Sequence, residues 1–179
     1  MNAVKGWVIL SAASLLTSGC AKRLDFDWDV PAAHYHRHVF KKVGKAGTIQ
    51  GDFQLVGLHK DPNRKWYPGF DVGCSDGKRN AFKLVALARS EGGEIRDGVM
   101  SIGVAGLRDK EVVTSKRLMA IEAGKTYHFE YSWTAGGHYS AGVDGRQESA
   151  SGIRIPHKQC RLFASSVHVK FSNVVYEGE

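Results

Sequence analysis

Three histidines alternate with other residues in the run His34-Tyr35-His36-Arg37-His38. In an extended strand, side chains two residues apart point to the same side and lie about 7 Å apart. Neutral imidazole binds zinc and copper, so His34, His36 and His38 are the candidate metal ligands of this chain. The alternative is an exposed, partly protonated strand after Pro31, and we favour it because no fourth ligand is evident. We therefore assign no metal and no other cofactor.

A second group of residues suits saccharide binding. Lys65-Trp66-Tyr67-Pro68-Gly69 follows the turn-prone Asp61-Pro62-Asn63 and is expected in a loop. Aromatic side chains on loops stack on sugar rings, and cationic neighbours hold acidic saccharides. The candidate ligand-binding residues are Trp66, Tyr67, Arg64 and His59. The alternative is that these loop aromatics fold back and cover an edge of the domain.

The N-terminus carries a different kind of chemistry. Lys5 precedes a short apolar run, residues 7–16, which lacks the roughly 20 apolar residues of a membrane-spanning helix. Leu16-Thr17-Ser18-Gly19-Cys20 resembles the lipobox that bacterial lipoprotein signal peptidase recognises. The resemblance implies cleavage before Cys20 and a diacylglyceryl thioether on Cys20, with acyl chains such as palmitate. The alternatives are a buried core helix at 7–16, or an ordinary signal peptide whose Cys20 joins a disulfide.

The other two cysteines fit an exported protein. The chain has three cysteines, so acylation of Cys20 leaves Cys74 and Cys160 as a candidate disulfide pair in an oxidising compartment. The bridge would close a loop of roughly 85 residues and contribute on the order of 4 kcal/mol in the chain-entropy model. Without a CxxC spacing, these cysteines give no support for a structural zinc site.

The charge balance narrows the classes of molecule that this protein is expected to bind. Lys and Arg number 25 against 18 Asp and Glu, a formal net charge of +7. This excess favours acidic partners such as an anionic glycan, another envelope polymer or lipopolysaccharide phosphate. The alternative is a basic but unspecific surface, because the positive charges are scattered. The export signal argues against nucleic acid as a partner.

The elements that position these residues are strands. Past the N-terminal segment, the chain breaks into short alternating runs separated by turns rich in the 21 glycines. In Thr126–Trp133 the aromatic residues Tyr127, Phe129, Tyr131 and Trp133 share one side, which predicts a strand with one apolar face. Gly136-Gly137 and Asp144-Gly145 supply the turns on either side of its hairpin partner, residues 138–143. The other predicted strands are 48–58, 70–74, 81–89, 100–104, 111–114, 117–122, 161–164, 167–171 and 174–176.

These runs predict an all-β fold, an antiparallel sandwich or barrel. Residues 81–89 are compatible with a helix by propensity, but their neighbours are strands and we predict a strand there. The expected organisation is a signal peptide at 1–19, a lipidated tether at 20–30 and a β-sandwich domain at 31–179.

Three segments resemble the concanavalin A-like lectin/glucanase superfamily. Gly51-Asp52-Phe53-Gln54-Leu55-Val56-Gly57 is similar to its early G-D-F-x-L strand. Residues 124–133 with 139–145 are similar to its central G-x-x-Y-x-F-x-Y-x-W…V-D-G hairpin, and 167–174 to its final V-x-F-x-N-V strand. The resemblance spans about residues 48–176 and implies a jelly roll of two curved sheets. Such packing and turn signatures imply a fold more than an activity.

The enzymatic signatures of that fold are missing from the sequence. Its glycoside hydrolases place carboxylates as Glu-x-Asp-x-x-Glu on one strand, and no such motif is present. Glu130 and Glu148 are the nearest candidates, but each lacks a second carboxylate at strand spacing. The Arg-x-Glu-x-Arg and Tyr-x-Lys-x-Gly-x-Tyr-x-Gln strands of polysaccharide lyases are also missing, so we assign no catalytic residue.

The sequence therefore favours a non-catalytic lipoprotein of the bacterial cell envelope that binds glycan or another envelope component. Lipid anchoring through Cys20 would hold it at a membrane, and Ala21 after the cysteine is compatible with the outer membrane. The alternatives are a divergent polysaccharide-degrading enzyme, either a glycoside hydrolase or a lyase, and a structural envelope-assembly protein.

Overall fold

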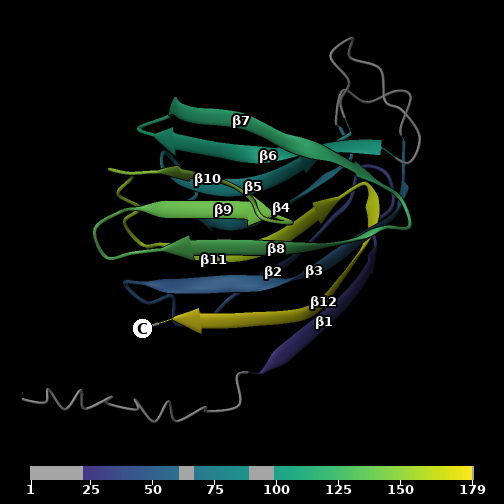
Figure 1. Cartoon of the computed structure of the whole chain (residues 1–179), viewed down its shortest axis with the longest axis horizontal. Helices are drawn as coiled ribbons and strands as arrows, with labels where there is room; N and C mark the ends of the chain where they lie inside the picture. The colour runs from purple at the N-terminus through teal and green to yellow at the C-terminus, as the bar shows by residue number, and fades with distance from the viewer. Residues whose placement is uncertain (1–21, 61–66, 89–98, 179) are drawn as a thin grey trace, which may run out of the picture.

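The chain forms a sandwich of two six-stranded antiparallel sheets (Figure 1). The structure is a computed structural model, and it describes residues 22–60, 67–88 and 99–178. Sheet A contains, in spatial order, β1 (Arg23–Asp29), β12 (Val167–Gly178), β3 (Gly47–Leu58), β8 (Thr126–Trp133), β9 (Tyr139–Val143) and β10 (Arg146–Ala150). Sheet B contains β2 (Tyr35–Val39), β11 (Gln159–Ser165), β4 (Gly69–Ser75), β5 (Ala81–Leu87), β6 (Val99–Arg108) and β7 (Glu111–Glu122). The predicted all-β antiparallel sandwich is confirmed. In the described ranges no helix has the length and hydrophobicity to cross a membrane.

The core follows from the alternation of side chains along each strand. In β8 every second residue is buried, and Phe129, Tyr131 and Trp133 are at most 2% exposed. Their rings meet aromatic residues from the facing sheet, since Phe82 lies 6.0 Å from Tyr131 between ring centroids. A strand with this period places all its apolar residues on one face, so two such sheets enclose a single aromatic core.

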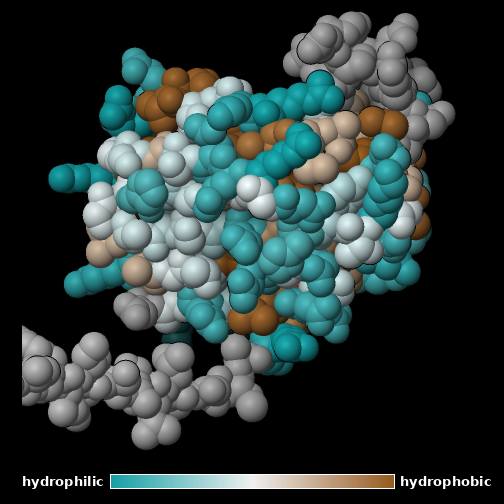
Figure 2. Space-filling model, in the orientation of Figure 1, coloured by the Kyte–Doolittle hydropathy of each residue, from teal (hydrophilic) through white to brown (hydrophobic). Residues whose placement is uncertain are grey.

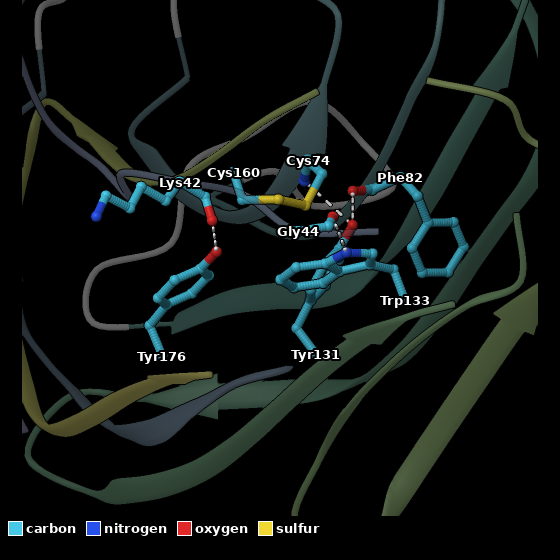
Figure 3. Close-up of a disulfide and its surroundings, with 8 residues drawn as sticks. All are labelled: Lys42, Gly44, Cys74, Phe82, Tyr131, Trp133, Cys160 and Tyr176. Atoms are coloured by element: carbon cyan, nitrogen blue, oxygen red, sulfur yellow. Dashed lines mark hydrogen bonds between the residues drawn. A yellow bond between two sulfur atoms is a disulfide. The ribbon is translucent and has the colours of Figure 1, made fainter. Parts of the chain in front are cut away.

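Tyr131 also joins the two sheets through its hydroxyl group (Figure 3). The hydroxyl accepts a hydrogen bond from the backbone N–H of Cys74 at 3.1 Å and donates one to the carbonyl of Phe82 at 2.8 Å. Cys74 and Phe82 are opposite each other on β4 and β5, so the hydroxyl lies between two paired strands of sheet B. The tyrosine thereby fixes the position of sheet B relative to sheet A at this point.

The predicted disulfide between Cys74 and Cys160 is present (Figure 3). The two cysteines are directly opposite each other on the neighbouring strands β4 and β11, and both are fully buried. The bridge joins segments separated by 86 residues in the sequence. Beside it, the indole N–H of Trp133 donates to the carbonyl of Gly44 at 3.1 Å.

The predicted turns of the central hairpin are also present. Asp144 and Gly145 have φ values of 47° and 76°, so both residues of the β9–β10 turn adopt the left-handed conformation that a tight hairpin requires. Gly137, with φ of 76°, serves the preceding turn between β8 and β9. Figure 1 shows this β8–β9 turn at the left end of the sandwich.

The expected tether at 20–30 needs correction, because Arg23–Asp29 is strand β1 of sheet A. Its register with β12 runs from Arg23 opposite Val175 to Asp29 opposite His168. Leu24, Phe26 and Trp28 pack against the core while the aspartates between them are exposed. This alternation of apolar and charged residues is visible in the sequence.

Several other strands also differ from the prediction. The runs 111–114 and 117–122 form one strand, β7, whose pairing with β6 absorbs two β-bulges. The runs 167–171 and 174–176 likewise form one strand, β12, with register shifts against β3. The sequence did not predict β10. The predicted strand at 81–89 is confirmed as β5 over Ala81–Leu87, and residue 89 lies outside the described ranges.

Candidate functional site

The outer face of sheet B carries a hollow of about 450 Å³ over β5, β6 and β7. It is lined by Val85, Leu87, Ser101, Ile102, Gly103, Val104, Ala105, Ser115, Lys116 and Arg117. Small residues on β6 leave the middle open, and Gly103 is required because a Cβ there would collide with the carbonyl oxygen of Lys116. Leu87, which is 41% exposed, gives the hollow an apolar side chain open to solvent.

Beside this hollow, three charged side chains meet on the same face. Asp71 on β4 accepts a hydrogen bond from the Lys83 ammonium group on β5 at 3.1 Å. Its same oxygen lies 3.6 Å from the guanidinium group of Arg161 on β11. Asp71 is only 8% exposed, so its charge is balanced mainly by these two cations rather than by water.

Two buried polar atoms of this cluster remain unsatisfied. The second carboxylate oxygen of Asp71 and Nε of Arg161 have no hydrogen-bond partner in the part of the chain that the structure describes. Buried polar groups in proteins are nearly always hydrogen-bonded to protein, ordered water or a ligand, so each of these two atoms can take one further partner. The cluster carries two positive charges against one negative charge, which favours an anionic ligand.

Aromatic side chains extend the cluster toward the edge of sheet B. The Arg161 guanidinium lies over the Phe163 ring, 4.8 Å from its centroid. Phe163 stacks in turn on Tyr35 of the edge strand β2, with 5.7 Å between ring centroids and an interplanar angle of 24°. Tyr35 is 57% exposed, so its ring is open to a ligand on this face.

The predicted loop residues fall largely outside the described structure. Arg64 and Trp66 lie in the segment 61–66, which is outside the described ranges. Tyr67 is exposed just before β4, and His59 follows β3. His59 is paired with the carboxylate of Asp29 through a 2.6 Å contact from Nε2, so its ring is engaged with β1. Cys20 also lies outside the described ranges.

The histidine run corresponds to strand β2, with His34 just before it. His36 and His38 pack against the aromatic residues of β1: the His38 ring is tilted on Phe26 with 4.9 Å between ring centroids, and His36 and Trp28 form a T-shaped pair at 6.3 Å. Burial lowers the pKa of His38 below its usual 6.5. Among the described residues no group of three or more His, Cys, Asp or Glu is arranged to hold a metal ion.

Glu130 is on sheet A, and Glu148 contacts one lining residue of the hollow, Lys116. Glu130 is exposed on β8, with its carboxylate 3.7 Å from Nε2 of His128. Glu148 binds the Lys116 ammonium at 2.6 Å, which joins β10 to β7 where the edges of the two sheets meet. These carboxylates have separate partners and do not form a pair.

The outer face of sheet A differs in chemistry from that of sheet B. In Figure 2, where β8 and β9 of sheet A are nearest the viewer, the middle of the visible surface is hydrophilic or of intermediate hydropathy, and hydrophobic residues show mainly toward its upper and lower margins. Carboxylates and imidazoles pair there, with Asp27 at 2.8 Å from His168 and Asp52 at 2.9 Å from His128. These acids are engaged by side chains of the protein itself, so this face offers fewer free charges to a ligand.

Sequence reasoning missed Asp71, Lys83 and Arg161, although a signal for two of them was available. The predicted Cys74–Cys160 bridge pairs β4 with β11 and points both cysteines inward. Side chains alternate along a strand, so a residue at an odd distance from an inward cysteine points outward. Asp71 is three residues before Cys74, and Arg161 directly follows Cys160, so both must point outward. Lys83 required knowledge that β5 lies on the other side of β4.

No protein-family model matches this chain, and no curated protein matches it in sequence. Several solved structures are similar in fold. A carbohydrate-binding module from Bacillus subtilis is 14% identical, with a TM-score of 0.52 over 88% of this chain and 92% of that one. An alginate lyase from Alteromonas sp. 272 is 9% identical, with a TM-score of 0.54 over 83% and 80%. A toad ovary galectin, solved with thio-digalactose, is 11% identical, with a TM-score of 0.51 over 82% and 100%. At these identities the likeness shows the fold alone: the chain is a jelly-roll β-sandwich like those of concanavalin A-like lectins and alginate lyases.

Proposed function

We propose that this protein is a non-catalytic, lipid-anchored envelope protein that binds acidic glycan on the outer face of sheet B. The observation that carries the proposal is the 450 Å³ hollow on that face, beside the cluster of Asp71, Lys83 and Arg161. The similar structures include a carbohydrate-binding module and a galectin in complex with a disaccharide analogue, which supports a carbohydrate ligand.

The two parts of the face suit different parts of a sugar. Val85, Leu87 and Ala105 present apolar side chains in the hollow, against which the C–H face of a pyranose ring can pack. Arg117 in the hollow and Arg161 beside it offer planar guanidinium groups that bind carboxylates in a bidentate manner. This combination favours a uronic acid polymer over a neutral glucan.

The chemistry of this face supports binding rather than catalysis. A retaining glycosidase needs two carboxylates about 5 Å apart, whereas Asp71 is held between two cations. The histidines of the described strands of sheet B, His36 and His38, are on β2 opposite core residues of β11 and so do not belong to the outer face. Neither of these two histidines is therefore placed to act as the general base of a lyase on this face.

Calorimetric titration of the purified full-length protein in detergent with oligouronates and with neutral oligoglucosides tests the site. Ser101→Trp places a bulky ring in the hollow, and we expect it to weaken oligouronate binding about tenfold or more. Ser132→Trp is the matched control, because Ser132 is equally half-buried but faces outward from sheet A. Failure of every oligosaccharide to bind at millimolar concentration, or equal affinities for the two variants, would refute the proposed site. Release of reducing or unsaturated ends would refute the non-catalytic role.

The anchor is the second part of the proposal. With Cys74 and Cys160 paired, Cys20 is the third of three cysteines and has no partner for an intrachain disulfide. This leaves its thiol available for acylation. Cells fed an alkyne-labelled palmitate should label the wild-type protein and not Cys20→Ser, which should also fail to be processed. Equal labelling of the two proteins would contradict anchoring at Cys20.

A further inference from the structure

A second hollow lies at one end of the sandwich, away from the outer face of sheet B. It is formed by the β8–β9 turn, at the left in Figure 1, and by the segment that leads from β10 to β11. Its volume is about 580 Å³. The lining residues are Thr134, Ala135, Gly136, Gly137, Tyr139, Ile153, Arg154, Ile155, Pro156 and Lys158.

The lining of this end hollow is positively charged. Lys158 and Arg154 are its two ionised side chains, and the ten lining residues include no carboxylate. The Lys158 ammonium lies over two buried aromatic rings, 5.4 Å from the centroid of Trp133 and 5.7 Å from that of Tyr139. Its contacts are therefore with ring faces, and it has no ion-pair partner within the described ranges.

This placement of Lys158 has an electrostatic cost. Burial lowers the pKa of Lys158 below its usual 10.5, since the ammonium loses water without gaining a negative charge. Ring faces compensate only in part, because a cation–π contact is weaker than a charge-assisted hydrogen bond. A negative group entering the hollow would complete the pairing of both cations.

The turn leaves room for such a group. Gly137 has a φ of 76°, and a Cβ at this position would lie 2.9 Å from the carbonyl oxygen of Ile153. Glycine at this point therefore permits both the left-handed turn and the close approach of the two segments that form the hollow. At the neighbouring Gly136, apart from the residues next to it in the chain, only the Thr134 hydroxyl lies within 4 Å of the place of a Cβ, so a ligand can approach the turn backbone there.

We propose that this end hollow is a second binding site, which takes the carboxylate or sulfate group of a single sugar unit between Lys158 and Arg154. The aromatic rings beneath Lys158 keep the ammonium in place, and the glycine turn allows the sugar to approach. The site does not depend on the proposed glycan face of sheet B, because the two hollows share no lining residue.

Nuclear magnetic resonance titration of the full-length protein in detergent with glucuronate, glucose 6-sulfate and glucose tests this site. Glucuronate or glucose sulfate, or both, should shift the amide signals of Gly136 and Gly137, and glucose should leave them in place. Saturation with the bound anion should also raise the pKa of Lys158, followed by its side-chain carbon signals.

Lys158→Met removes the charge and keeps an apolar stem against the rings, so we expect the fold to persist and the affinity to fall about tenfold. Lys78→Met, on an exposed turn between β4 and β5, is the matched control and should bind as the wild type does. The proposal is overturned if both anions leave the glycine amides unmoved at millimolar concentration, or if Lys158→Met binds as tightly as Lys78→Met. Ser101→Trp should retain this binding, which separates failure here from failure at sheet B.

Discussion

The hydroxyl of Tyr131 makes a prediction that can be worked from the structure. It is buried between β4 and β5, where it accepts from the Cys74 N–H and donates to the Phe82 carbonyl. Tyr131→Phe removes this oxygen and preserves the ring, so packing of the core changes little. Both backbone groups then lose a partner where water does not enter, at about 1–3 kcal/mol for each buried group left unsatisfied.

We therefore expect Tyr131→Phe to lower the free energy of unfolding by about 3 kcal/mol, which corresponds to a fall in Tm of roughly 6–12 °C for a domain of this size. Two tyrosines on the same core provide matched controls. The Tyr127 hydroxyl accepts one hydrogen bond, from the Glu122 N–H at 3.0 Å, so Tyr127→Phe should cost about 1 kcal/mol. The Tyr139 hydroxyl has no hydrogen-bond partner among the residues described, and Tyr139→Phe should be nearly neutral.

Urea unfolding followed by tryptophan fluorescence measures this series, with unchanged slopes required for a comparison of stabilities. Hydrogen exchange gives a local readout, because the Cys74 amide should exchange faster in Tyr131→Phe than in Tyr139→Phe. Equal stabilities of Tyr131→Phe and Tyr139→Phe would refute the reasoning. That result would mean that β4 and β5 close on each other and satisfy their own backbone groups.

Three other perturbations follow from the structure. Asp71→Asn leaves two half-buried cations without their carboxylate and should destabilise the fold by about 3 kcal/mol in chemical denaturation; no change in midpoint would contradict the ion-pair geometry. Reduction of the disulfide, or Cys74→Ser, removes a constraint over 86 residues and should cost about 4 kcal/mol, seen as a lower Tm with reductant; a Tm unchanged by reductant would argue against the bridge. Burial alone would raise the pKa of Asp76, but hydrogen bonds from the N–H of Arg79 and from the Asn80 side chain hold it well below its usual 3.8. The stabilisation from Asp76 is therefore complete above the unfolded-state pKa of about 3.9 and is lost as pH falls toward the lower folded-state value. Asp76→Asn should flatten the pH dependence of Tm in acid, and a profile as steep as that of the wild type would contradict this role.

Local patterns in the sequence predicted much of the fold correctly. The aromatic alternation over residues 126–133 and the Asp144-Gly145 turn depend on neighbouring residues alone, and both are confirmed. The same rule applied to Leu24, Phe26 and Trp28 would have predicted β1, which the charged residues between them obscured. In β7 the pattern was interrupted because bulges shift which side chains face the core.

The candidate site was harder to predict, since its residues come from three separate parts of the chain. Asp71, Lys83 and Arg161 meet because β5 and β11 pair with β4 on opposite sides. Such an order of strands is set by non-local packing, whereas the inward or outward direction of a side chain is set by its place along one strand.

By itself, the sequence determined which side chains are buried and which are exposed along most strands, and where the chain turns; it offered Cys74 and Cys160 as a candidate disulfide pair, which the structure confirms. The tertiary structure alone decided which strands are neighbours, and therefore where the hollow and the charged cluster lie. The physical reason is that the two-residue period of a strand is a property of its own backbone, while strand order depends on the burial of both sheets against each other.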